Sequence, residues 1–119
     1  MTDEAKQELL NAGVDLEGAM ERFLHNEAMY EKFLKKFLAD PNYQELVAAV
    51  EEKDCNRAFT AAHTLKGVCG NLALQGLFFA IRDQVECFRS GKFEEGAAMM
   101  PAVIEEYDKI VSMINKTFP

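Results

Sequence analysis

Tryptophan is absent from this chain of 119 residues, and proline (three residues) and glycine (seven) are scarce. So few helix breakers leave room for long helices, and no segment keeps the alternating period of a strand for long. No stretch approaches the roughly 18 consecutive apolar residues of a membrane span. The segment Met1–Leu10 also lacks the basic start and apolar core of a signal peptide. We therefore expect a cytoplasmic, helical protein with no membrane partner.

The three cysteines, Cys55, Cys69 and Cys87, are odd in number and form no C-x-x-C pair. This pattern argues against a disulfide framework and against a zinc site. Reduced thiols that behave as small hydrophobic side chains fit a cytosolic protein.

Positive charge is also in short supply, because 13 Lys and Arg residues stand against 20 Asp and Glu residues, a formal net charge of −7. An acidic surface repels a phosphate backbone, so we expect no nucleic-acid partner. Residues 55–92 are the exception, with five basic and two acidic side chains, or +3, which leaves −10 for the rest of the chain.

Helical periodicity of apolar residues is present throughout and predicts helices over residues 3–10, 16–24, 27–39, 41–52, 55–72, 74–89 and 93–116. Asp15, Asn26 and Asp54 stand just before three of these segments and should cap their first turns. Pro101 lies inside the last pattern and should kink that helix or mark its true start. We expect one all-α domain over residues 1–119. Its fold would be an antiparallel up-and-down four-helix bundle, with a core bundle at about residues 27–116 and short accessory N-terminal helices.

The predicted helix over residues 55–72 is the most informative segment. At 100° per residue, one arc holds its apolar side chains: Ala58, Ala61, Ala62, Leu65, Val68, Cys69 and Leu72. His63 points about 160° away from the centre of that arc, towards solvent. Its neighbours on this outer face are Phe59, Thr60, Gly67, Gly70 and Asn71, with Lys66 at the margin.

Two glycines inside a helix need a reason, because each costs about 0.8–1.0 kcal/mol relative to alanine. On an exposed face, Gly67 and Gly70 would leave a bare strip of backbone beside His63, where another protein can approach closely. Phe59 would add apolar contact area. The plain alternative is that Gly67 marks an early helix end and that His63 is an ordinary surface residue.

An accessible histidine beside a cation suits the acceptance of a phosphoryl group. Imidazole is a nucleophile near neutral pH, and Lys66 would attract a phosphoryl anion, an effect of order 0.2–1 kcal/mol at an exposed position. A hydrolase would instead need a cleft with an oxyanion site. A metal site would need more ligands, but His25 is the only other histidine and no H-E-x-x-H pattern exists.

The stretch Ala62–Gly67, A-H-T-L-K-G, resembles the signature of the histidine-containing phosphotransfer (HPt) domains. The similarity continues through Asn71-Leu72-Ala73-Leu74 and Leu77 to Val85-Glu86, and it covers about residues 13–116. Ala73, where many members have glycine, and Val85, where they have leucine, are mild departures.

This resemblance implies a four-helix bundle in which a ring nitrogen of His63 is phosphorylated, with Lys66 and Gly67 as the supporting pair. It implies transfer to and from an aspartate of a response-regulator receiver domain, which supplies Mg²⁺, so that the chain itself needs no cofactor. The expected partners are receiver domains and a hybrid histidine kinase, and we expect a monomer.

Further residues have two interpretations each. If the helices over 55–72 and 74–89 form an antiparallel hairpin, Arg82 lies roughly level with His63, as a phosphate contact or as a solvated flank. Phe79 is either docking surface or buried by the accessory helices. For His25 we expect a loop position, and for Met99-Met100 a place in the core.

Two other functions remain open at this point. The chain could be the phosphoacceptor module of a larger chemotaxis-type histidine kinase, or a helical adaptor that binds receivers without being phosphorylated. The sequence contains no ATP-binding motif, begins with Met1 and ends soon after its last helix. We therefore expect a stand-alone, bacterial-type phosphocarrier that is not itself an enzyme.

Overall fold

The computed structural model describes residues 1–119 and is helical throughout, apart from an isolated bridge between Val14 and Leu74. Its helices are α1 (Asp3–Asn11), α2 (Leu16–Arg22), α3 (Glu27–Phe37), α4 (Asn42–Glu51), α5 (Cys55–Asn71), α6 (Gln75–Arg89), α7 (Phe93–Ala98) and α8 (Met100–Thr117). The all-α class predicted from periodicity is confirmed. Every predicted bound lies within two residues of the observed one, except that the last predicted helix is divided.

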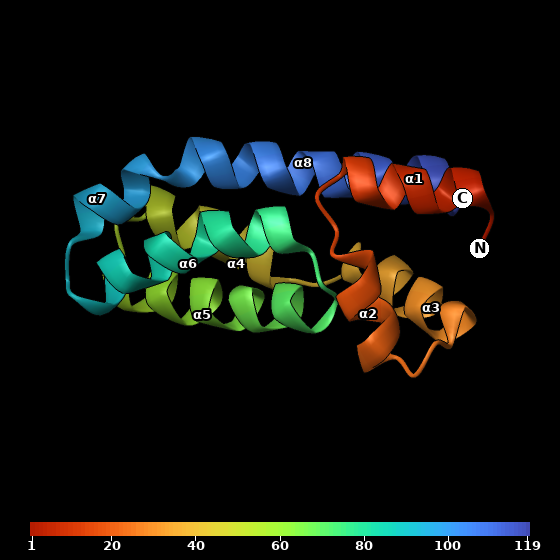
Figure 1. Ribbon diagram of the computed structural model, residues 1–119. Coiled ribbons are helices and arrows are strands. Elements are labelled where there is room, and N and C mark those ends of the chain that lie inside the picture. Colours follow the sequence, from red (N-terminus) through yellow and green to blue (C-terminus); the bar gives the residue numbers. More distant parts are fainter.

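The chain runs back and forth along a molecule 43 Å long (Figure 1). α3 and α4 follow one another in one direction, α5 returns, α6 runs out again and α8 returns. α4 packs on α5, α5 on α6, and α6 on α8, while α1 lies along α8. This is the predicted antiparallel bundle with accessory N-terminal helices, and both chain ends lie at the same end of it.

One contiguous hydrophobic core runs through the bundle, and Gln84 is the only polar residue buried with it. The apolar arc predicted for α5 is buried along its whole length except at Val68, which is half-buried. Tyr43 of α4 and Tyr107 of α8 stack with ring centres 3.5 Å apart, which joins the first and last sides of the bundle.

Side-chain caps begin four of the helices. The Thr2 hydroxyl accepts from the Ala5 amide at the start of α1. Asp15, Asn26 and Asp54 each accept a hydrogen bond from a backbone amide in the first turn of α2, α3 and α5, as the sequence predicts. α4 differs from the prediction, because Pro41 precedes the helix instead of being its first residue. The Asp40 carboxylate accepts from the Asn42 amide at 2.9 Å and so still stabilises this helix start.

Five helices are followed by a residue with left-handed backbone, but only two of these residues are glycine. Leu24 (φ +52°) follows α2. Gly13 (φ +84°) follows α1 and Gly91 (φ +73°) follows α6. Lys53 (φ +55°) follows α4 and Ala73 (φ +57°) follows α5. A Cβ atom in this conformation crowds the following carbonyl oxygen, at a cost of roughly 1–2 kcal/mol. The backbone at Ala73 therefore gives a physical reason for glycine at this position in the family that the sequence resembles.

The predicted helix over residues 93–116 is two helices. The chain breaks at Met99, and Pro101 occupies the first turn of α8, where its missing N–H would have no partner in any case. The interpretation that Pro101 marks the true start of the last helix is therefore the correct one. The buried Gln84 side chain donates from Nε2 to the Gly96 carbonyl at 3.1 Å, which holds α7 against α6.

The segment between α1 and α2 is hydrogen-bonded to the turn between α5 and α6. The Asp15 amide donates to the Ala73 carbonyl at 2.9 Å, and the amides of Gln75 and Gly76 both donate to the Gly13 carbonyl at 3.1 Å. These contacts fix the end of α5 that lies beyond His63.

Candidate functional site

His63 lies in the middle of α5 and is exposed to solvent. The solvent-facing orientation inferred from the helical wheel is confirmed. The hydroxyls of the nearby Thr60 and Thr64 donate to the carbonyls of Asn56 and Thr60, at 3.1 and 2.9 Å, so both are engaged within the helix. The imidazole is thus the nucleophilic group that this face presents.

The backbone beside His63 is open at Gly67 only. Gly67 is helical and exposed, so the alternative that it ends the helix early is wrong. A Cβ atom at Gly67 would meet no atom within 4 Å. At Gly70 a Cβ would lie 3.5 Å from the Phe78 ring, and Arg22 donates to the Gly70 carbonyl. The bare strip is therefore shorter than predicted and does not extend to Gly70.

Phe59 contacts the imidazole directly. The two rings lie 15° from parallel with centres 5.6 Å apart, and Phe59 is half-buried. The guanidinium of Arg89, on α6, lies over the Phe59 ring at 5.0 Å. The sequence predicts that Phe59 contacts a partner protein, and it does not predict the contact between Arg89 and Phe59. This contact depends on how α5 and α6 are aligned along their length.

The observed alignment of α6 against α5 also places Arg82 at a different level from the predicted one. Since Arg89 lies over Phe59 and Phe78 lies beside Gly70, Arg82 is opposite Lys66, about one helical turn from the level of His63. The predicted level of Arg82 is corrected by this amount. Its guanidinium lies 5.0 Å from the centre of the Phe79 ring.

Phe79 itself is 47 % exposed, so the accessory helices do not bury it. Asn71, at the end of α5, is also exposed. Both side chains lie on the same side of His63, towards the turn between α5 and α6, and extend the exposed surface in that direction.

Lys66 is the basic side chain of this face that has no acidic partner. Arg82 pairs with Asp83 at 3.4 Å and Arg89 with Glu86 at 3.4 Å, whereas no carboxylate lies within ion-pair distance of Lys66. An incoming anion beside His63 would therefore find the Lys66 ammonium group uncompensated.

The second histidine lies elsewhere. His25 is exposed in the turn between α2 and α3 with φ +60°, which confirms its predicted loop position. Met100 is buried, as expected for the core, and Met99 is half-buried.

The Hpt domain family model matches residues 28–112, a segment that holds α5, α6 and His63 but not His25. No curated protein and no solved structure matches the chain significantly. None of the helices combines the length and the apolar composition of a membrane span. With most of its length matched, the chain belongs to the Hpt domain family, whose members carry phosphoryl groups on a histidine in phosphorelay signalling.

Proposed function

We propose that His63 accepts a phosphoryl group from the aspartyl phosphate of a receiver domain and returns it to such an aspartate. One observation carries this assignment: His63 is the only histidine within the matched residues 28–112, and it is exposed in mid-helix. His25 lies outside that segment, in a turn.

The proposed step needs little from this chain. A lone pair of a ring nitrogen attacks phosphorus while the bond from phosphorus to the aspartate oxygen breaks, and the carboxylate leaves with the electron pair. The reverse step regenerates the free imidazole. Lys66 attracts the transferred group, and the receiver supplies Mg²⁺ and the activated phosphate. The open backbone at Gly67 lets the partner's active site approach the ring.

Other exposed side chains of the α5–α6 pair would contact a partner that docks over His63. Asn71, Phe79 and Arg82 are exposed on the same helix pair and would meet the partner beyond the reacting groups. A hybrid kinase that phosphorylates this chain would do so through its own receiver domain. Donor and acceptor would therefore both present a receiver aspartate, and one docking surface serves both. We further propose that the chain acts as a cytoplasmic monomer.

The direct test mixes this protein with a receiver domain that has been phosphorylated by acetyl phosphate. We expect an acid-labile label on this chain and none when ATP alone is added. Labelling by ATP alone would identify a kinase activity instead. Tight receiver binding without any label would identify an adaptor.

A charge-matched pair of variants tests the supporting cation. Lys66→Ala should slow transfer several-fold, because it removes the uncompensated charge beside the acceptor. Lys92→Ala removes the same charge at the exposed turn before α7 and should transfer at the parental rate. If both variants behave alike, Lys66 acts only through the overall charge of the protein.

A further inference from the structure

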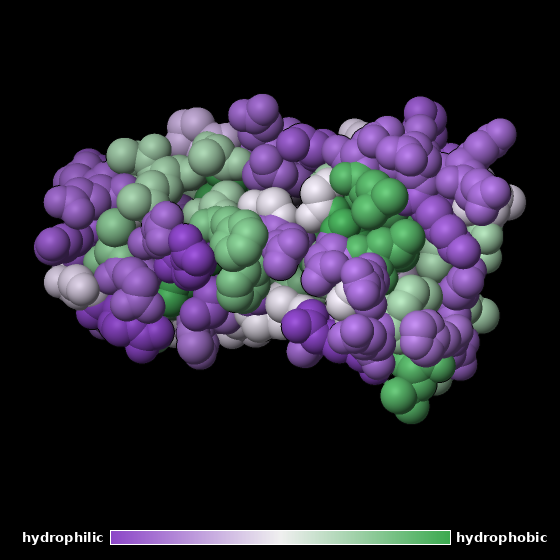
Figure 2. All heavy atoms as spheres, viewed as in Figure 1, coloured by the Kyte–Doolittle hydropathy of each residue, from purple (hydrophilic) through white to green (hydrophobic).

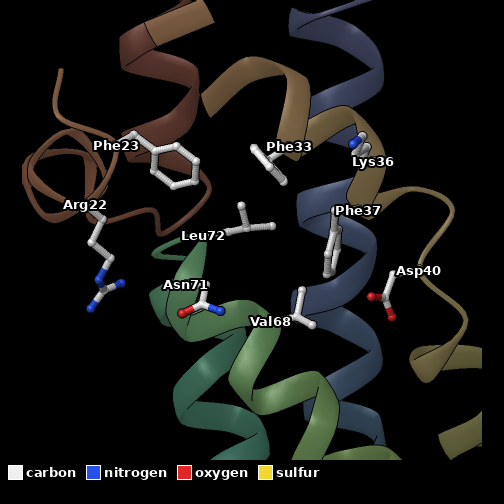
Figure 3. Close-up of a pocket in the computed structure, with 9 residues that line it drawn as sticks. All are labelled: Arg22, Phe23, Phe33, Lys36, Phe37, Asp40, Val68, Asn71 and Leu72. Atoms are coloured by element: carbon white, nitrogen blue, oxygen red, sulfur yellow. The ribbon is translucent and has the colours of Figure 1, made fainter. Parts of the chain in front are cut away.

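A cavity of about 450 Å³ opens between α2, α3 and the end of α5 (Figure 3). Its walls are apolar: Phe23, Phe33, Phe37, Val68 and Leu72. This volume falls within the range of sites that hold small organic molecules, which are lined mainly by hydrophobic and aromatic side chains. Nothing in the proposed transfer step uses this cavity.

Hydrogen bonds and ring contacts hold the walls in place. The Tyr30 hydroxyl donates to the Leu72 carbonyl at 2.7 Å, which ties α3 to the end of α5. Arg22 donates to the Gly70 carbonyl, which ties α2 to the same helix. The Phe23 ring packs against Tyr30 and Phe33, with centres 5.2 and 5.7 Å away. The cavity is therefore formed before any ligand arrives.

The same end of the molecule exposes unusual apolar surface. Figure 2 shows strongly hydrophobic atoms gathered over the end formed by the N-terminal helices, against a mainly hydrophilic surface. Leu24 is 86 % exposed at the end of α2, and Phe33 is 40 % exposed at the cavity. Of these two side chains Phe33 lines the cavity, so an apolar molecule that entered it would cover part of a ring that now faces water.

Two cations without acidic partners flank the opening. Arg22 and Lys36 both line the cavity, on opposite sides in Figure 3, and neither has a carboxylate within ion-pair distance. The Lys36 ammonium lies 5.1 Å from the centre of the Phe33 ring. The one acidic side chain, Asp40, already accepts hydrogen bonds from the Asn42 amide and side chain, at 2.9 and 2.8 Å. The rim therefore favours an anion, in a protein whose net charge is −7.

We propose that this cavity binds a small amphipathic anion, a molecule with an aromatic or aliphatic body and one carboxylate, sulfonate or phosphate group. The body would fill the space between Phe23, Phe33 and Leu72, and the anionic group would meet Lys36 at the rim. Asn71 also lines the cavity and lies eight residues after His63, about 12 Å along α5. The ligand would thus sit beside the phosphorylation site without touching it.

Two fluorescent probes with the same ring system test both parts of the proposal. 8-Anilinonaphthalene-1-sulfonate carries the anionic group, and N-phenyl-1-naphthylamine lacks it. We expect both to bind the folded protein and the sulfonate to bind more tightly. Circular dichroism of each variant, measured alongside, ensures that the fluorescence comes from folded protein.

A matched pair of variants tests the charge. Lys36→Gln should weaken binding of the sulfonate up to about fivefold and leave the neutral probe unchanged. Lys32→Gln removes the same charge from the same helix, outside the cavity, and should change neither affinity. Equal losses in the two variants would overturn the role of Lys36.

Two further experiments test whether the probes bind in this cavity. One fills the cavity with a larger side chain, and the other maps which amide chemical shifts change when the probe binds. Val68→Trp should abolish binding of both probes. In the unmodified protein, amide resonances that move with the sulfonate probe should belong to Phe33, Val68, Asn71 and Leu72. Binding elsewhere, or no binding, would overturn the proposal. If only a receiver domain shifts these resonances, the cavity belongs to a protein interface and the small-anion assignment is wrong.

Discussion

The guanidinium carbon of Arg89 lies 5.0 Å from the centre of the Phe59 ring, and the same ring stacks on His63. A cation on α6 therefore supports the aromatic side chain that limits how the imidazole can turn. Cation–π contacts at exposed sites contribute about 0.5–1 kcal/mol. The three residues form a stack that links the two helices of the site.

We expect Phe59→Ala to slow phosphoryl transfer several-fold, because the imidazole would lose the ring that restricts its rotation. Arg89→Gln should have a smaller effect, about two- to fivefold at most. Lys109→Gln is the control, since it removes one exposed positive charge on α8, away from the stack and from the α5–α6 face. Transfer rates and the nitrogen resonances of the His63 ring are measured together. Unchanged ring resonances in Phe59→Ala would show that the stack does not orient the imidazole.

His63→Gln should keep the helical circular dichroism of the parent and lose all transfer. The side chain is exposed, so the substitution removes the nucleophile without disturbing the core. His25→Gln is the control and should accept label at the parental rate. A label that persists in His63→Gln, or that disappears in His25→Gln, would contradict the assignment.

Gly67→Ala should stabilise the fold by up to about 1 kcal/mol, because the residue is helical and a Cβ there meets no atom within 4 Å. Gly67→Gln fits the isolated protein equally well but should slow transfer by blocking the partner's approach. Thermal melting and transfer rate are followed on the same samples. Parental transfer by Gly67→Gln would mean that no partner comes close to this backbone.

Lys53→Gly should raise the free energy of unfolding by about 1 kcal/mol, because glycine adopts the left-handed backbone at the end of α4 without strain. The exposed Lys53 side chain contributes no packing that would be lost. Gly91→Ala is the converse variant and should destabilise by a similar amount, since only its backbone conformation opposes a Cβ there. Denaturant unfolding measures the change in the free energy of unfolding for each variant. The explanation by backbone conformation requires an increase for Lys53→Gly and a decrease for Gly91→Ala.

Burial, with a smaller contribution from the charge of Asp40, raises the pKa of the Cys69 thiol to about 12 from an ordinary value of 9.0. The unfolded chain then releases this proton first, so the stabilisation is complete below pH 9 and is lost as the pH rises towards 12. Between these two pH values, this one thiol lowers the free energy of unfolding by about 1.4 kcal/mol per pH unit. Urea unfolding at pH 8 to 11 should show a shallower decline in Cys69→Ala than in the parent. Parallel declines would show that the thiol does not contribute.

The parts of the structure that depend on local sequence could be predicted. The buried arc of α5 and the caps Asp15, Asn26 and Asp54 follow from residues within one or two turns of each other. The exposure of His63 follows from the same arc. The chemistry assigned to His63 came from the resemblance of its neighbouring residues to a family, and the family itself is confirmed by the match over residues 28–112.

The parts that depend on distant segments could not be predicted. Arg89 meets Phe59, and Phe78 covers Gly70, only because α5 and α6 pack at one particular register. The cavity between α2, α3 and α5 likewise requires three elements to meet. Left-handed backbone at Lys53 and Ala73 escapes a sequence analysis because these residue types give no local signal for it.

The hydrogen bonds from Gln75 and Gly76 to Gly13 have a consequence for hydrogen exchange. Amides in the first turn of a helix have no partner within it and normally exchange rapidly with solvent. Here the protection of these two amides depends on a carbonyl about sixty residues earlier in the chain. Their exchange rates therefore report how often the N-terminal segment detaches from the bundle, while amides in the middle of α6 report opening of the bundle itself. Comparing the two sets would show whether the accessory helices and the bundle unfold as one cooperative unit or as two.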